Sequence, residues 1–193
     1  MKRNKILIYT TVTVLLGGLA YLKAQQLVQN KIQNNEIKQL KSKKILYFNP
    51  DIQPDLEEIK EPSNSTFFSA ASDKLSENNQ NILLRADQLI PFDEVNPDTI
   101  KEYCLNNQAD YAVVSKIKYF KVGLGKYVFS SQVIVGMKLY NAHGDLLTET
   151  QYDTYKKNKR LLGSAENFVK LGTKGALKEV LRCLKLQKTN SST

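Results

Sequence analysis

Histidine and cysteine, which build many metal centres and catalytic sites, are almost absent from this sequence. Its 193 residues include one histidine, His143, two cysteines, Cys104 and Cys183, and no tryptophan. These cysteines and the single histidine are too few for a structural zinc site, which takes four such ligands. We therefore expect no metal and no other cofactor.

Cysteine is also missing from the N-terminal region, so we expect no lipid anchor there. In an oxidising compartment Cys104 and Cys183 could pair and close a loop of ~80 residues, worth ~4.5 kcal/mol in the chain-entropy treatment. The alternative is two buried thiols in helices. Both alternatives stay open, because the sequence does not place the two Cα atoms within bridging distance.

Motifs of nucleophilic catalysis are missing too. His143 lies in the stretch LYNAHGDLLTET, residues 139–150, directly before Gly144. Short polar residues beside a glycine are typical of a hairpin turn. No G-x-S-x-G run accompanies this histidine, so a Ser-His or Cys-His site would need partners from elsewhere in the chain. We interpret His143 as a turn residue.

Two other short patterns also indicate loops rather than chemistry. The stretch GLGKY, residues 123–127, lacks the full G-x-x-x-x-G-K-[ST] run of a phosphate-binding loop and lies between two predicted strands. The adjacent carboxylates Glu57-Glu58 and Asp93-Glu94 fall in loop-like stretches beside proline, where neighbouring side chains point apart. Together with the lone histidine, these patterns predict a protein that is not an enzyme.

Negative charge is in the minority, since the formal net charge is +9. The lysines are spread along the chain, and the only dense basic run is short, at residues 156–160. No zinc-finger spacing, helix-turn-helix or RNA-binding aromatic motif accompanies the charge. Nucleic-acid binding is therefore a minor alternative, and an anionic lipid, polysaccharide or acidic protein surface fits the charge as well.

The N-terminus combines a basic cluster with an uncharged run. MKRNK precedes Ile6–Leu22, which holds seventeen residues without a charge. As a helix this run is ~26 Å long, slightly short of the ~30 Å hydrocarbon core. Residues 1–24 are thus predicted to be a signal peptide cleaved after Ala24, or a transmembrane anchor that holds the chain at the inner membrane. Either alternative places the rest of the chain in the periplasm or outside the cell.

The remaining chain is predicted to form one domain behind a linker. Residues 25–44 are polar with partly helical spacing, which indicates a helical stalk. Residues 45–187 carry the folded domain, and residues 188–193 are a polar, disordered tail.

Within the domain, the first half predicts alternating strands and helices. Ile45–Phe48 is a short apolar run that ends at Asn49-Pro50 and indicates a strand. A helix is expected from a cap at Ser65 or Thr66, whereas Ile82–Leu84 could belong to a strand or a helix. Asn96 followed by Pro97 marks the start of another helix.

The second half predicts an antiparallel meander. Residues 111–120 alternate with period two, so Val113 falls on one side of the strand and Lys116 and Lys118 fall on the other. Residues 132–140 alternate in the same way, with Val135 on the buried side, and 145–155 continues as a third strand. Short glycine-bearing connections at 122–126 and 141–145 join the three. A final helix begins at Ser164. We predict an α/β (α+β) fold in which a central mixed sheet, containing the three-strand meander, is flanked by helices.

This order of elements, together with two short motifs, resembles a family of bacterial envelope domains. Ala109-Asp110-Tyr111 opens the meander after a helix, and residues 139–144, LYNAHG, end its second strand. The family includes the N-terminal domain of TolB, the curli secretion lipoprotein CsgG, the polysaccharide-export protein PelC and the penicillin-binding-protein activator LpoB. The resemblance covers residues 44–186 and implies a non-catalytic role in envelope assembly, through other envelope proteins or through oligomerisation.

Two classes of function follow. The first is an envelope scaffold or accessory protein that binds other proteins and contacts the membrane through Ile6–Leu22. The second is a basic binding module for an anionic lipid headgroup, polysaccharide or nucleic acid. Salt dependence separates them, because electrostatic binding weakens steeply with salt and an apolar protein interface does not.

Overall fold

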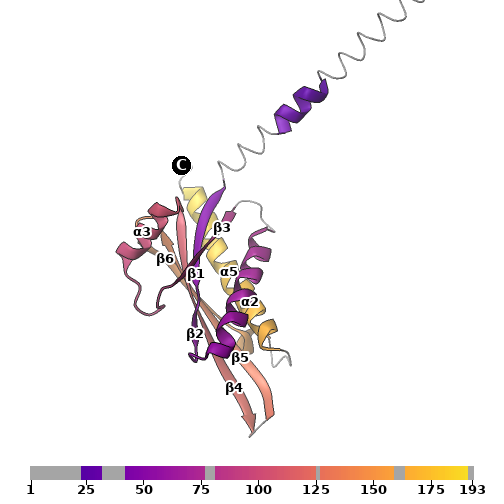
Figure 1. Cartoon of the computed structure of the whole chain (residues 1–193), viewed down its shortest axis with the longest axis vertical. Helices are drawn as coiled ribbons and strands as arrows, with labels where there is room; N and C mark the ends of the chain where they lie inside the picture. Colours follow the sequence, from indigo (N-terminus) through magenta and orange to yellow (C-terminus); the bar gives the residue numbers. More distant parts are fainter. Residues whose placement is uncertain (1–22, 32–41, 77–80, 125–126, 159–163, 191–193) are drawn as a thin grey trace, which may run out of the picture. The chain divides into compact units, whose positions relative to one another are not determined.

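The computed structural model describes residues 23–31, 42–76, 81–124, 127–158 and 164–190 (Figure 1). The chain divides into two compact units, Met1–Ser42 and Lys43–Thr193. In the first unit, residues 23–31 are helical and exposed, and residues 25–31 of this helix belong to the range predicted as a stalk. The predicted anchor or signal segment Ile6–Leu22 lies outside the described residues. Within the described parts of the chain, no helix is both long enough and apolar enough to cross a bilayer.

The second unit is built on one mixed six-stranded sheet flanked by helices, which confirms the predicted fold class. The strand order is β3-β1-β4-β5-β6, and β2 pairs with β4. The first strand of the domain therefore lies inside the sheet, with β3 and β4 parallel to it on either side. In chain order the elements are β1 (Lys43–Asn49), β2 (Asp51–Gln53), α2 (Glu57–Ser76), β3 (Asn81–Leu89), α3 (Pro97–Asn106), β4 (Tyr111–Leu124), β5 (Tyr127–Asn141), β6 (Leu146–Asp153), α4 (Thr154–Asn158) and α5 (Ala165–Asn190).

The Ala109-Asp110-Tyr111 motif ties β1 to β4. Asp110 accepts two hydrogen bonds, from Lys43 Nζ to Oδ1 at 2.9 Å and from the Lys44 backbone nitrogen to Oδ2 at 2.8 Å. The side-chain hydrogen bond is the main reason why the pKa of Lys43 is raised. Tyr111 then pairs with Ile45 in parallel register. The motif thus aligns two strands that are distant in the sequence.

The predicted meander is present as β4, β5 and β6, which pair antiparallel in succession. Its second turn contains Gly144 at φ +89°, a left-handed conformation that glycine adopts without steric cost. A Cβ atom on Gly144 would lie 2.4 Å from the carbonyl oxygen of Pro97, at the start of α3. Glycine is therefore required here both by the turn and by its close approach to α3.

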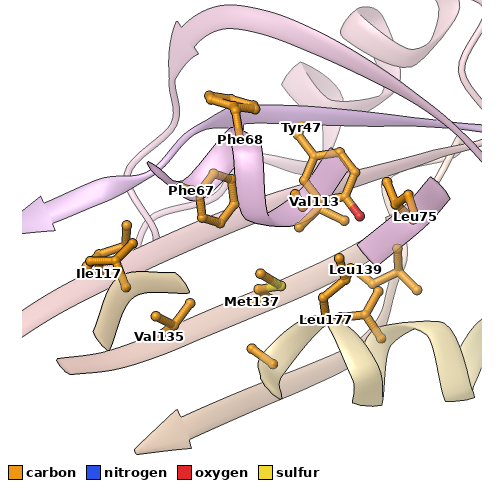
Figure 2. Packing of buried hydrophobic residues seen from close by; sticks show 14 of the residues in the cluster. Tyr47, Phe67, Phe68, Leu75, Val113, Ile117, Val135, Met137, Leu139 and Leu177 are labelled. Atoms are coloured by element: carbon orange, nitrogen blue, oxygen red, sulfur yellow. The ribbon is translucent and has the colours of Figure 1, made fainter. Parts of the chain in front are cut away.

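Helices α2 and α5 cover one face of the sheet, and the larger hydrophobic core lies between them and the strands (Figure 2). Every second residue of β4 and β5 points into this core, as the sequence predicts, and Phe67 and Phe68 of α2 pack against them. The fully buried members include Tyr47, Phe67, Val113, Ile117, Val133, Val135, Met137, Leu139 and Leu177.

Helix α5 approaches the sheet closely through two glycines. A Cβ atom on Gly172 would lie 2.6 Å from Val135 Cγ2, and one on Gly175 would lie 2.2 Å from Tyr152 Cδ2. The side chains of β5 and β6 therefore occupy the space that larger residues would take on the helix.

The other face carries a smaller core beneath α3. Leu46, Phe48, Ala112 and Val114 lie there against Ile100 and other buried residues of α3 and of the chain before it. The helix starts as predicted, because the Asn96 side chain accepts a hydrogen bond from the Asp98 backbone nitrogen at 2.9 Å and Pro97 follows the cap.

The prediction for the start of α2 was wrong. The helix begins at Glu57, not after Ser65 or Thr66, and it contains Pro62. Proline lacks the backbone N–H and therefore suggested a loop. One lost hydrogen bond near the helix start is outweighed by the burial of Phe67, Phe68 and further residues along the same helix.

One assignment that the sequence left open is settled, and both ends of the last helix are located. Residues 82–84 belong to strand β3, not to a helix. Helix α5 starts after Ser164, whose Oγ accepts a hydrogen bond from the Asn167 backbone nitrogen at 3.3 Å. It continues to Asn190, into the range predicted as a tail, and residues 191–193 lie outside the described residues.

Candidate functional site

In the part of the chain that the structure describes, the face of the sheet that carries α3 is covered only in part. Beyond the small core under α3, the same face of β4, β5 and β6 forms a hollow of about 260 Å³, which we call the open-face hollow. Three adjacent strands supply its walls, and the segment before α3 closes one side. Its lining residues are Phe92, Asp93, Lys116, Lys118, Ile134, Gly136, Glu149, Thr150 and Gln151.

Phe92 is fixed as the buried wall of this hollow. Its ring lies against β5 at Gly136, where an added Cβ atom would be 3.1 Å from Phe92 Cζ. Its backbone is held at both ends, because its nitrogen donates to Asp51 Oδ2 at 3.4 Å and its carbonyl oxygen accepts from Lys138 Nζ at 2.8 Å. The segment that crosses the sheet is thus anchored to strands on both sides.

Lysines surround the aromatic ring. Lys138 Nζ lies 4.5 Å from the Phe92 ring centroid and Lys116 Nζ lies 5.8 Å from it, within the range of cation–π attraction. Lys116 also forms a hydrogen-bonded ion pair with Asp93, and this contact lowers the pKa of the Asp93 carboxyl. Lys138 lies 4.0 Å from Glu149 Oε2.

Lys118 differs from these two lysines. Among the described residues no carboxylate lies within ion-pair distance of it, and its Nζ lies 5.1 Å from the ring centroid of Phe120. The surface therefore combines two neutralised lysines, one exposed cation and the amide of Gln151. Such an arrangement suits polar contacts with a partner surface, and it offers no nucleophile paired with a base.

Asp93 of the Asp93-Glu94 pair lines the hollow, but the histidine and the Glu57-Glu58 pair weighed for catalysis lie elsewhere. The backbone nitrogen of His143 donates to Asn141 Oδ1 at 2.9 Å in the turn between β5 and β6, and the side chain is exposed. Gly123 and Leu124 end β4, consistent with a hairpin connection. Glu57 and Glu58 lie in the first turn of α2 and not in a loop. Among the described residues, no group of three His, Cys, Asp or Glu side chains is placed to hold a metal ion.

The structure does not bring the two cysteines together. Cys104 is buried in the small core under α3, whereas Cys183 lies on α5 beside the large core on the opposite face. Both are free thiols. Burial, and to a lesser degree the charge of Asp110, raises the pKa of the Cys104 thiol to about 11.

Sequence reasoning placed Lys116 and Lys118 on the correct side of β4 but did not identify the hollow. The residue that the sequence did not point to was Phe92, which contacts β5 from a loop distant in the sequence. One local signal was available, because a glycine inside an alternating strand, Gly136, often marks a close approach by another part of the chain.

Comparison with known proteins gives a likeness in fold. No family model and no curated protein matches the sequence. The PelC dodecamer from Paraburkholderia phytofirmans is similar with a TM-score of 0.51 at 11% identity, over 71% of this chain and 86% of that chain. Lipoprotein GNA1162 from Neisseria meningitidis gives a TM-score of 0.46 at 12% identity, over 72% and 99%. The likeness to PelC confirms, at the level of the fold, the resemblance predicted from the sequence.

Proposed function

We propose that this protein is a non-catalytic accessory of the bacterial cell envelope that acts through contacts with other proteins. The observation that carries the proposal is the uncovered part of the sheet, where the open-face hollow presents Lys118 and Gln151 beside the ion pairs of Lys116 and Lys138. The likeness in fold to PelC, which forms a dodecamer, supports an envelope role and self-association as one form of contact.

The charge balance of the hollow favours a protein partner over an anionic ligand. Lys116 and Lys118 line the hollow together with Asp93 and Glu149, and Lys138 adjoins it. Lys116 and Lys138 already have acidic partners. Binding to a polyanion gains its free energy from each cation that neutralises a phosphate, so one unneutralised lysine adds little. A protein surface that carries both charges matches this pattern better.

We further propose that the domain lies on the outer side of the inner membrane. The basic cluster and the uncharged segment Ile6–Leu22 support export, either with this segment retained as an anchor or with cleavage after Ala24.

Site-specific photocrosslinking in living cells tests the contact surface. A photoreactive phenylalanine derivative is placed at Lys118 or at Gln151 in the full-length chain, and at Lys178, an exposed position of α5, as a control. We expect covalent protein products from the first two positions and fewer from the third. A product of twice the chain mass indicates self-association, and a different mass indicates another protein.

The same products measured in washed membranes separate the two classes of function. Raising the salt from about 0.1 M to about 1 M shortens the Debye length from about 10 Å to about 3 Å. We expect most of the protein product to persist. Products from Lys178 alone, or binding to anionic lipid vesicles that disappears with salt, would contradict a protein interface at the hollow.

A further inference from the structure

A second and larger hollow lies on the helical side of the domain, at the end of the sheet where α2 and α5 both begin. Its volume is about 500 Å³, within the range of about 300–1,000 Å³ that is typical of small-molecule sites. Carbon atoms dominate its walls, which come from Leu56, Ile59 and Pro62 around the first turns of α2, Ala165 at the start of α5 and Tyr119 of β4. We call it the helix-start cavity.

One hydrogen-bond chain sets the polarity of the cavity wall. Ser63 Oγ donates its proton to the Ile59 carbonyl oxygen at 2.5 Å and lies 2.6 Å from the Tyr119 hydroxyl. Because a serine has a single hydroxyl proton, the contact between the two hydroxyls must be donated by Tyr119. Burial, the main cause, raises the pKa of Tyr119, so its proton is retained at neutral pH. The phenolic oxygen is left as a hydrogen-bond acceptor.

The two charged groups of the wall are carboxylates, which also accept hydrogen bonds. Glu58 and Glu166 line the cavity from the first turns of the two helices, and Thr66 adds a hydroxyl that can donate or accept. Each helix start contributes roughly half a positive charge. Two full carboxylate charges exceed these two partial charges, so the cavity is negative overall.

The surroundings of the cavity reinforce this sign within a chain of net charge +9. The nearby cation Lys60 forms its ion pairs with Asp55 and Glu57, at 2.7 Å and 2.6 Å, rather than with Glu58. At physiological salt, charges more than about 8 Å away are largely screened. The local carboxylates therefore outweigh the positive charge of the rest of the protein.

We propose that the helix-start cavity binds a small organic cation, in which a protonated amine is joined to an apolar body. The apolar body would lie against Leu56, Ile59, Pro62 and the Tyr119 ring. The amine would donate hydrogen bonds to the carboxylates of Glu58 and Glu166 and to the phenolic oxygen. An anionic ligand is disfavoured, because the two carboxylate charges of Glu58 and Glu166 would repel it.

Three probes with one apolar body test the proposal: 2-phenylethylammonium, 2-phenylethanol and 3-phenylpropionate. Their dissociation constants for the purified full-length protein are measured by ligand-observed NMR. We expect the ammonium to bind tightest and the carboxylate weakest. Absence of saturable ammonium binding, or equal affinity for the three probes, would overturn the proposal.

Two variants place the binding in this cavity. The double substitution Glu58→Gln and Glu166→Gln should weaken ammonium binding about three- to tenfold and leave the alcohol unchanged, since exposed ion pairs are individually weak. Glu179→Gln on α5, which removes one equivalent charge outside the cavity, is the control and should change nothing. Equal losses in the double variant and the control would contradict the assignment.

Filling the cavity gives an independent test. Ala165 is exposed at the first position of α5, so Ala165→Phe should reduce the space without unfolding the domain, which circular dichroism verifies. We expect binding of the ammonium and the alcohol to fall at least tenfold. Unchanged affinity in the folded variant would exclude this cavity as the site.

Discussion

Individual glycines decide how closely α5 lies on the sheet. We expect Gly175→Ala to destabilise the domain, because the new Cβ atom would lie 2.2 Å from the Tyr152 ring. Overpacking costs about 1–3 kcal/mol, whereas the higher helix propensity of alanine returns only about 0.5–1 kcal/mol. Urea denaturation measures the difference, with Lys178→Ala at an exposed position of the same helix as the control. A variant more stable than the parent would show that α5 does not approach the sheet this closely.

The two thiols should differ in reactivity. At pH 8 a thiol whose pKa is about 11 is almost entirely protonated, and Cys104 is also only 1% exposed. We expect a thiol reagent to modify Cys183, which is partly exposed, well before Cys104. The variants Cys104→Ser and Cys183→Ser assign the two rates. If neither thiol reacts until a reductant is added, the cysteines are paired and the placement on opposite faces is wrong.

At the scale of elements, local sequence patterns predicted the strand faces and helix starts that depend on residues close together in the chain. The alternation in β4 and β5 placed Val113 and Val135 on the buried face, and the Asn96-Pro97 pair located the start of α3. The start of α2 was missed because Pro62 is tolerated within the helix, a consequence of tertiary packing that no local rule contains. The same holds for the pairing of β1 with two distant strands.

The candidate site was less predictable than the fold. Lys116 and Lys118 were assigned to one side of β4, but their meeting with Phe92 depends on the path of the segment between β3 and α3. That path is set by contacts with Asp51 and Lys138, far away in the sequence. Alternation along a strand therefore gives the side on which a residue lies, not what covers it.

Adjacent residues of β5 test the assignment of its two faces. Val135 is fully buried beneath α5, so Val135→Asp should cost about 3–5 kcal/mol, because the new carboxylate would have no partner in the core. Ile134 lines the open-face hollow and is only partly buried, so Ile134→Asp should cost clearly less. Thermal melting of the two variants gives the order, and a reversed order would mean that the faces are exchanged.

At the scale of the whole molecule, location can be tested with two reporters. Alkaline phosphatase joined after Thr193 is expected to be active, because that enzyme requires export, and a fluorescent protein that does not mature outside the cytoplasm should stay dark at the same position. The basic cluster before Ile6–Leu22 motivates this topology. A bright fusion together with an inactive phosphatase would place the domain in the cytoplasm and remove the basis for an envelope role.

The interior position of β1 has a consequence for the order of folding. β1 is the first strand of the domain to be synthesised, yet both of its partners, β3 and β4, come later in the chain. Antiparallel hairpins such as β4–β5–β6 close through short loops. Parallel pairing of β1 spans 38 residues from Lys43 to Asn81 in β3 and 66 residues from Ile45 to Tyr111 in β4, so it must first bear a larger loss of chain entropy. We expect pulsed hydrogen exchange to show protection of β4–β6 before β1. Until then β1 is an apolar strand with both edges free, open to aggregation or to capture by a chaperone.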